Sequence, residues 1–583
     1  MKKEDIKESK KRKKVKEKKE ETQKIKNIKF LVLAIAAIII FCISISPVTL
    51  QNDTYYTIKI GEHILNTKTI DMQDHFSWHE LPYTYPHWAY DVMIYVFYAL
   101  GGMQAIFIST IVFTCILGIL MYCTNYKISK NKPISFMITI GAMFLLKDFI
   151  AARAQLVTFI LFELVILLIE EFLEKKKIRY FSGIVLIGIA IANLHCAVWP
   201  FLFVIFLPYI AEYLIFTLVD ANIIHKIKVI IYEKRLKANK KKLENIKLEN
   251  EKEKYNKKIN NIILKQEEEK NRNIKILKKR EERRNHPYKI RYNKNKNAKW
   301  LILVMIVLAF SGLITPLGDT PYTYLYKTMQ GNTTQSISEH LPLILIDNKP
   351  ILFVLVSILA LLIFTDTKIS LKDLFMISGL ILLMFITRRQ ESMLILLGSA
   401  VICKLITDLF MKYDKNGLKE LEKIMTSSLG IVATILVIAM ISIEEIKPKL
   451  KDKFINSSSY PVEAAEYIKN NLDLSEIRLF NEYNYGSYLL YQGIPVFIDS
   501  RADLYAPEFN GKKNEEGKDD GEDIFTDYIK TSNMSRYYET TFDKYDITHV
   551  ILYKNSKLNI YLSEDDKYKE LYSDKKFVIY ERD

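Results

Sequence analysis

Residues 28–48 read IKFLVLAIAAIIIFCISISPV, and residues 52–91 read NDTYYTIKIGEHILNTKTIDMQDHFSWHELPYTYPHWAYD. The first stretch has the length and apolar character of a helix that crosses the ~30 Å hydrocarbon layer of a membrane. Its apolar run is too long for a signal peptide, and no small-residue cleavage site precedes Gln51, so we expect a permanent span. The second stretch then lies at a membrane face, where its carboxylates and imidazoles are costly unless they have a function.

Similar apolar segments recur along the chain. They lie at 105–123, 133–147, 156–172, 180–197, 199–218, 299–317, 350–366, 372–387, 391–411 and 425–443. Because only helices and closed barrels satisfy the backbone in lipid, these segments predict a polytopic α-helical membrane protein with about 11–12 spans.

One apolar segment, 88–100, is short, and Gly101 and Gly102 separate it from the next span. If it crossed the membrane, the charge rule would fail at several later loops. We therefore expect it to lie at the outer interface or to enter the membrane only partway. The alternative is a count of twelve, in which another segment fails to cross.

The basic residues predict the orientation of the chain. It carries 83 Lys and Arg against 67 Asp and Glu, a net charge of +16. An N-terminal arm, 1–26, and an insert, 219–298, are strongly charged, and the positive-inside rule places both in the cytoplasm. Eleven spans then form two membrane modules, 27–218 and 299–443, and leave residues 444–583 outside. The heavy use of Lys, Ile, Asn and Tyr suggests an AT-rich bacterial genome, and hence a bacterial cytoplasmic membrane.

The N-terminal arm is expected to be an orientation signal and a solvated tail, and contact with anionic membrane lipid is the alternative. Basic residues near an anionic surface contribute about 1 kcal/mol each to binding. In the insert, both signs of charge are interspersed and aromatic residues are few, so nucleic-acid binding is not expected. Leu and Ile recur there too loosely for a sustained heptad, and we expect an exposed helix or a partly disordered segment.

Residues 444–583 differ from the rest of the chain. β-rich runs lie at 477–480, 495–501, 548–553 and 577–582, and a helical pattern lies at 461–472. This alternation predicts a small extracytoplasmic α/β domain. All five cysteines lie instead in or beside apolar spans, so no disulfide framework is expected.

The outer loop, 49–87, supplies the candidate catalytic residues. Asp53 lies just beyond the first span, where a carboxylate can take a proton from an acceptor hydroxyl. Asp74 and His87 are the accompanying candidates, and a helix cap is the structural alternative for the carboxylates. The loop also holds four of the nine histidines: His63, His75, His79 and His87. No metal ligands are assigned to them, and a divalent metal stays an open alternative.

Arginines on the outer face are candidate phosphate ligands. Arg153, Arg388 and Arg389 run against the charge bias of the outer loops, and a phosphate-bearing substrate would explain them. The alternative is an ion pair with Asp148 or Glu391.

Two further pairs of residues complete the candidate set. His195 lies in a turn between helices, and Glu339 lies in the other long outer loop. Both are candidates for substrate binding, although His195 can also be a core histidine. Asp499 and Arg501 end a predicted strand, where active-site residues often lie, and a structural ion pair is the alternative.

Several stretches resemble bacterial GT-C-fold membrane proteins, which are relatives of protein O-mannosyltransferases and lipid-A aminoarabinose transferases. The first outer loop carries the resemblance in DTYYTIKIGEHIL (53–65), DHFSW (74–78) and YPHWAYDVMIYVFYALGG (85–102). One bacterial branch of this class is similar to ANLHCAVWP (192–200), TPLGDTPY (315–322), SISEHLP (336–342), NEYNYGSYL (481–489) and VFIDSRADLY (496–505). The resemblance covers most of the chain outside the arm and the insert.

The resemblance implies a specific chemistry. In this class an Asp soon after the first span is the catalytic base, which corresponds to Asp53. The class also implies a polyprenyl-phosphate-linked sugar as donor, an outward-facing site and no nucleotide sugar. The chain departs from the O-mannosyltransferases, whose acidic pair is absent because Thr54 follows Asp53.

The sequence therefore predicts a glycosyltransferase that moves a sugar from a polyprenyl-phosphate donor to an extracytoplasmic acceptor. A transporter or flippase, or a non-catalytic envelope assembly protein, are the alternatives. Catalytic Ser motifs, Gly-rich phosphate loops and Walker sequences are absent from the sequence, which disfavours an ATP-driven pump.

Overall fold

Each of the eleven long apolar runs forms a helix in the computed structural model, which describes residues 28–583 apart from 222, 247, 286–288, 292–294, 332 and 512–520. The predicted arm, 1–26, lies outside the described residues. The helices of the bundle are Ile28–Ile45, α3 (Trp88–Ser129), α4 (Lys132–Leu146), α5 (Ala154–Lys175), α6 (Ile178–Leu194), α7 (Phe201–Ala221), α10 (Lys299–Ser311), α13 (Lys349–Phe364), α14 (Leu371–Ile386), α15 (Glu391–Tyr413) and α17 (Ser428–Ile446).

Among the residues that the structure describes, five helices have the length and apolar composition to cross a membrane: Ile28–Ile45, Trp88–Ser129, Cys196–Ile215, Arg388–Tyr413 and Ser428–Lys451. Large apolar side chains also cover the outside of the bundle. Leu429 and Met440 of α17 are exposed, as are Phe353 and Phe364 of α13. Water disfavours such a surface, whereas lipid does not. The chain is therefore a helical membrane protein.

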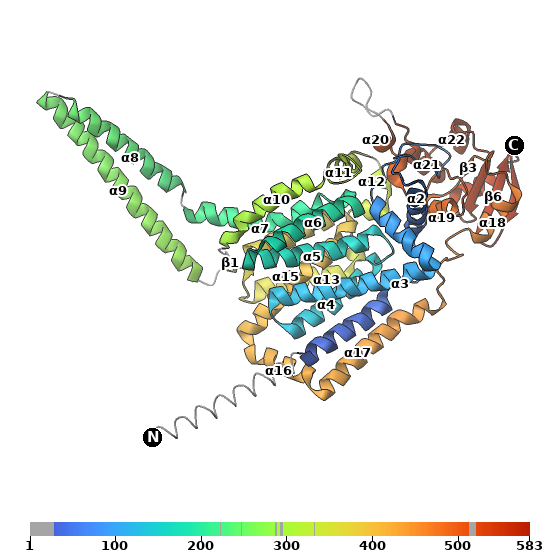
Figure 1. Cartoon of the computed structure of the whole chain (residues 1–583), viewed down its shortest axis with the longest axis horizontal. Coiled ribbons are helices and arrows are strands. Elements are labelled where there is room, and N and C mark those ends of the chain that lie inside the picture. Colours follow the sequence, from blue (N-terminus) through green and yellow to red (C-terminus); the bar gives the residue numbers. More distant parts are fainter. Residues whose placement is uncertain are drawn as a thin grey trace.

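The helices of the bundle run back and forth between two ends (Figure 1). The C-terminal domain covers one end, which we call the domain end. The insert projects from the other, which we call the insert end. At the domain end, the N–H of Cys196 donates to the carbonyl of Pro86 (2.9 Å). At the insert end, the side chain of Asn297 donates to the carbonyl of Leu173 (2.8 Å).

The first part of the predicted outer loop is a helix. α2 (Asn52–Thr67) lies at the domain end, beside α3 and beside α19 (Tyr483–Tyr491) of the C-terminal domain. Asp53 in its first turn suits the positive end of the helix dipole. Gly61 allows close packing, because an added Cβ there would lie 2.2 Å from the carbonyl oxygen of Asp91.

The predicted break at Gly101 and Gly102 is confirmed. Both residues have non-helical backbone angles within α3, and Gly102 has a positive φ of 59°. Residues 88–100 are helical and lie beside α2 at the domain end, at an angle to the rest of α3 (Figure 1). The glycine pair therefore lets one helix serve both the bundle and the outer region.

The insert forms a helical hairpin. α8 (Ile223–Glu244) and α9 (Glu249–Asn285) pack along each other and project away from the bundle (Figure 1). β1 (Ile290–Arg291) follows and pairs in parallel with β2 (Ile369–Ser370). α16 (Lys415–Thr426) also lies at the insert end, where Glu422 lies 3.6 Å from Lys132 of α4.

The C-terminal domain combines a four-stranded sheet with short helices. Its strand order is β3-β4-β6-β5, with β3 parallel to β4 and the other neighbours antiparallel. The strands are β3 (Leu479–Phe480), β4 (His549–Tyr553), β5 (Tyr568–Ser573) and β6 (Phe577–Arg582). The helices of this domain are α18 (Val462–Asn471), α19, α20 (Pro507–Asn510), α21 (Ile524–Ser532), α22 (Tyr538–Lys544) and α23 (Lys557–Leu562).

The strand predicted at 495–501 is wrong. Its only ladder contact among the described residues is an isolated parallel bridge between Val496 and Ser77. The side chain of Asn481 satisfies this backbone instead: it accepts from the N–H of Phe497 (2.9 Å) and donates to the carbonyl of Ile498 (2.7 Å). The segment is buried and apolar, as a central strand is, but its backbone bonds to the side chain of Asn481 and not to a neighbouring strand.

Candidate functional site

The candidate site lies at the domain end of the bundle, where α2 and the starts and ends of several bundle helices meet. α11 (Thr320–Gln330) and α12 (Thr333–Ser336) lie at the same end (Figure 1). Short turns complete it: η2 (Cys196–Val198), η4 (Ser338–His340) and η6 (Arg388–Gln390). Residues that are far apart in the sequence therefore share one region.

Asp53, Arg153 and Glu339 form a charged group at this end. Arg153 is the N-cap of α5, and its guanidinium forms ion pairs with Asp53 and with Glu339, the latter at 3.4 Å. Burial opposes the charge of Arg153, but the two carboxylates raise its pKa. The pKa of Glu339 is lowered, because the two guanidinium groups of Arg153 and Arg389 outweigh its burial.

The ion pair leaves Asp53 available for a further contact. It involves Oδ2 of Asp53, and Oδ1 makes no hydrogen bond with the described residues. The Asp53 side chain is 20% exposed, so another molecule can reach it. The hydroxyl of Thr57 donates to the Asp53 carbonyl (2.9 Å), and that of Thr54 donates to the Ala152 carbonyl (3.1 Å). These bonds fix the first turn of α2 beside the segment that carries Arg153.

Arg389 adds a second positive charge beside Arg153. Its nearest charged neighbours include Arg153, Glu339 and Asp53, but its guanidinium makes no ion pair with the described residues. Arg388 is exposed, and its backbone N–H donates to the Leu341 carbonyl (2.8 Å). Two guanidinium groups with one direct set of carboxylate partners favour the binding of an anion.

The predicted alternative partners of the arginines are not their partners in the structure. Arg153 pairs with Asp53 and Glu339 rather than with Asp148 or Glu391. Glu391 feels the charge of Arg388, but the two form no ion pair within the described part of the chain.

His87 and His195 lie close together, with ring centroids 6.4 Å apart. Both nitrogens of His87 are occupied: Nδ1 lies 2.7 Å from Asp91 Oδ1, and Nε2 lies 3.0 Å from the Tyr56 hydroxyl. Burial disfavours the charged imidazole, but Asp91 outweighs this effect and raises the pKa of His87. His87 therefore joins α2 to α3, and its contact on α2, Tyr56, lies about one helical turn after Asp53.

His195 is buried and bonded to the hydroxyl of Thr158 through Nδ1 (2.9 Å). Burial lowers the pKa of His195 well below its usual range, and the nearby Arg389 acts in the same direction. Both effects favour the neutral imidazole, which agrees with the core-histidine alternative.

Asp74, Asp499 and Arg501 form a separate buried network. The Arg501 guanidinium binds Asp499 through Nε (2.9 Å) and a terminal nitrogen (2.6 Å), and binds Asp74 through the other terminal nitrogen (2.7 Å). Each of these side chains is 0% exposed. The hydroxyl of Tyr505 donates to Asp499 (2.6 Å), and Ser77 donates to Asp74. The network docks the outer loop onto the C-terminal domain. Asp499 and Arg501 therefore form the structural ion pair that was the alternative to an active-site role.

Asp503 is a residue of the candidate site that sequence reasoning missed. It lies in η8 (Ala502–Tyr505), two residues after Arg501, and accepts a hydrogen bond from the Tyr324 hydroxyl of α11. Burial raises the pKa of Asp503, whereas Tyr324 and the charge of Arg389 act against the rise. Its position beside Asp499 and Arg501 in SRADLY was the signal that could have identified it.

One group of His and Asp side chains in the described part of the chain has the spacing of metal ligands: His63, Asp71 and His75. It lies outside the charged group around Asp53. In comparisons with known proteins, the chain matches no protein-family model and no curated protein.

Proposed function

We propose that this chain is a glycosyltransferase of the bacterial cytoplasmic membrane. It transfers a sugar from a polyprenyl-phosphate donor to an extracytoplasmic acceptor, a cell-envelope glycan, lipid or protein. The observation that carries the proposal is the group formed by Asp53, Arg153, Glu339 and Arg389. It combines a reachable carboxylate with two guanidinium groups, one of which has no ion-pair partner among the described residues.

The proposed topology has eleven crossings, with the insert end in the cytoplasm and the domain end outside. The insert carries dense Lys and Arg, as cytoplasmic loops do. In this orientation the charged group lies at the outer membrane interface, where a lipid-linked donor can enter sideways between helices. The segment 88–100 lies at this interface rather than forming a twelfth crossing.

The proposed reaction is a displacement at the anomeric carbon of the sugar. An acceptor hydroxyl forms a bond to this carbon, the bond from carbon to phosphate oxygen breaks, and polyprenyl phosphate leaves. Asp53 Oδ1 takes the proton of the acceptor hydroxyl. Arg153 and Arg389 stabilise the negative charge that develops on the phosphate, since preorganised cations act most strongly where charge develops. Glu339 orients Arg153, and Asp503 lies on the C-terminal-domain side of this group.

A transfer assay tests the proposal. Purified wild-type protein receives a panel of radiolabelled polyprenyl-phosphate sugars, beside Asp53→Asn and a matched control, Glu62→Gln. Glu62 lies on the same helix and pairs with Lys59 on the helix surface. We expect transfer by the wild type and Glu62→Gln, and none by Asp53→Asn. Equal transfer by Asp53→Asn would refute the role of Asp53, and binding of a donor without transfer would indicate a transporter.

A further inference from the structure

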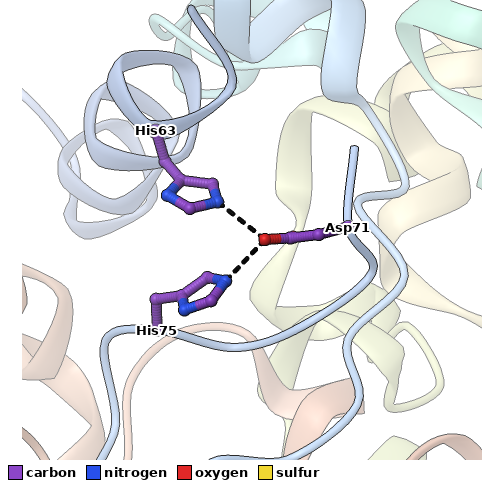
Figure 2. A group of neighbouring side chains, drawn as sticks. All are labelled: His63, Asp71 and His75. Atoms are coloured by element: carbon purple, nitrogen blue, oxygen red, sulfur yellow. Dashed lines mark hydrogen bonds and ion pairs between the residues drawn. The ribbon is translucent and has the colours of Figure 1, made fainter. Parts of the chain in front are cut away.

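His63, Asp71 and His75 converge on one point at the surface of the domain end (Figure 2). His63 lies near the end of α2, and the other two lie in the segment between α2 and α3. Nε2 of His63 lies 3.0 Å from Asp71 Oδ2, and Nε2 of His75 lies 2.7 Å from the same oxygen. The three ligand-type atoms lie within 4.8 Å of one another. Both imidazoles therefore direct Nε2 at the same oxygen of Asp71.

We propose that these three side chains bind one Zn²⁺ ion, through Nε2 of both histidines and Oδ2 of Asp71. Imidazole and carboxylate are ligands that zinc uses, typically at about 2.0–2.2 Å and in a tetrahedral arrangement. Ligand atoms of such a site lie about 3.3 Å from one another, so each imidazole nitrogen would move about 0.3–0.6 Å away from Asp71 Oδ2. The fourth position faces outward, because His75 is 40% exposed, and water fills it.

A neighbouring hydroxyl holds the carboxylate in the orientation that this site needs. The Tyr85 hydroxyl lies 2.8 Å from Asp71 Oδ1, the oxygen that does not face the histidines. Partners of this kind orient ligands in metal sites. Tyr85 itself is buried, so its hydroxyl has a fixed position. Asp71 is thereby held with one oxygen bound to protein and the other directed to the two imidazoles.

The proposed site lies at the opposite end of α2 from Asp53. His63 is ten residues from Asp53, which corresponds to about 15 Å along the axis of α2. A bound ion would join the end of α2 to the segment that carries Asp74 and its contact with Arg501. It would thereby fix the helix that positions Asp53. The inference does not depend on the proposed transferase activity, because metal binding is measured directly.

The test measures zinc in full-length protein that carries no polyhistidine tag and has been treated with a chelator. Competition with a chromophoric chelator gives the stoichiometry and affinity for Zn²⁺, and Co²⁺ absorption reports the tetrahedral geometry. We expect one ion per chain in the wild type and in His549→Gln, a control histidine in β4 of the C-terminal domain. We expect at least about 100-fold weaker binding in His63→Gln and His75→Gln, and about 10–100-fold weaker binding in Tyr85→Phe.

The thermal unfolding temperature of each metal-free variant serves as a control. If it equals that of metal-free wild type, the loss of zinc affinity is due to the missing ligand and not to misfolding. Wild-type protein that binds no zinc, or His63→Gln and His75→Gln variants that bind it as tightly as the wild type, would overturn the proposal. Neither result would bear on transfer by Asp53.

Discussion

Replacement of Arg501 by Gln should release the outer loop from the C-terminal domain. The guanidinium makes three charge-assisted hydrogen bonds, two to Asp499 and one to Asp74, and all of these side chains are buried. Its loss leaves two carboxylates in a buried site with no counter-ion. Breaking a buried pair in this way costs about 3–5 kcal/mol, which corresponds to about a 150- to 5,000-fold larger population of the opened state.

Amide hydrogen exchange of the loop measures this opening. The N–H of Asp74 donates to the Leu81 carbonyl (2.8 Å), and that of Tyr83 donates to the Met72 carbonyl (2.9 Å). Both amides should exchange faster by the factor given above, because exchange follows local opening. The control is Lys569→Gln, which removes an exposed ion pair and should change little.

A smaller change is expected for Asp74→Asn. Arg501 then keeps both of its bonds to Asp499, so the cost should be about 1–3 kcal/mol. Unchanged exchange of the loop amides in Arg501→Gln, relative to Lys569→Gln, would refute the role of this network in docking.

Three further predictions concern the same end of the molecule. Burial lowers the pKa of His79 to about 4, below the ordinary value of about 6.5, so the unfolded state binds more protons between these values. The contact of the outer loop with the C-terminal domain should therefore weaken by roughly 1–3 kcal/mol as the pH falls from 6.5 to 4, as measured by hydrogen exchange of the loop amides. The variant His79→Gln should show no such dependence on pH, and an equal decline in this variant would contradict the prediction. Gly61→Ala should destabilise the contact of α2 with α3 by about 1–3 kcal/mol in thermal unfolding, because the new Cβ would overlap the Asp91 carbonyl; unchanged stability would show that the helices separate easily. Arg389→Gln should weaken binding of the leaving group, polyprenyl phosphate, at least about tenfold in an equilibrium binding assay, because it removes a guanidinium group from the proposed phosphate site. Replacement of the exposed Arg388 by Gln should have a smaller effect, and the reverse order would refute the assignment.

The sequence predicted the bundle because spans in lipid must be long, apolar and helical. It did not predict α2, whose aromatic and β-branched residues are typical of strands. Tyr55 and Ile58 are buried in the cluster that α2 shares with the C-terminal domain, and packing of this kind overrides local propensity. The strand predicted at 495–501 failed because the side chain of Asn481, which lies 16 positions before Phe497, supplies hydrogen bonds that a neighbouring strand would provide.

Asp53, Arg153, Glu339 and Arg389 were singled out one by one from the sequence, but their contacts with one another were not predicted. For the outer arginines, an ion pair with Asp148 or Glu391 was the structural alternative to a phosphate-bearing substrate. The partners of Arg153 are Asp53 and Glu339, which lie 100 and 186 positions away in the chain. Contacts between residues so far apart in the chain depend on how the helices pack, and this packing could not be predicted from one sequence.

The most direct test of the central claim separates binding from chemistry in Asp53→Asn. Donor binding is measured at equilibrium, and transfer is measured in a single turnover with excess enzyme. If Asp53 is the general base, Asp53→Asn should bind the donor as wild type does, or more tightly because Arg153 is released, and should transfer the sugar about 10²- to 10⁴-fold more slowly. A single-turnover rate equal to that of the wild type would contradict the account.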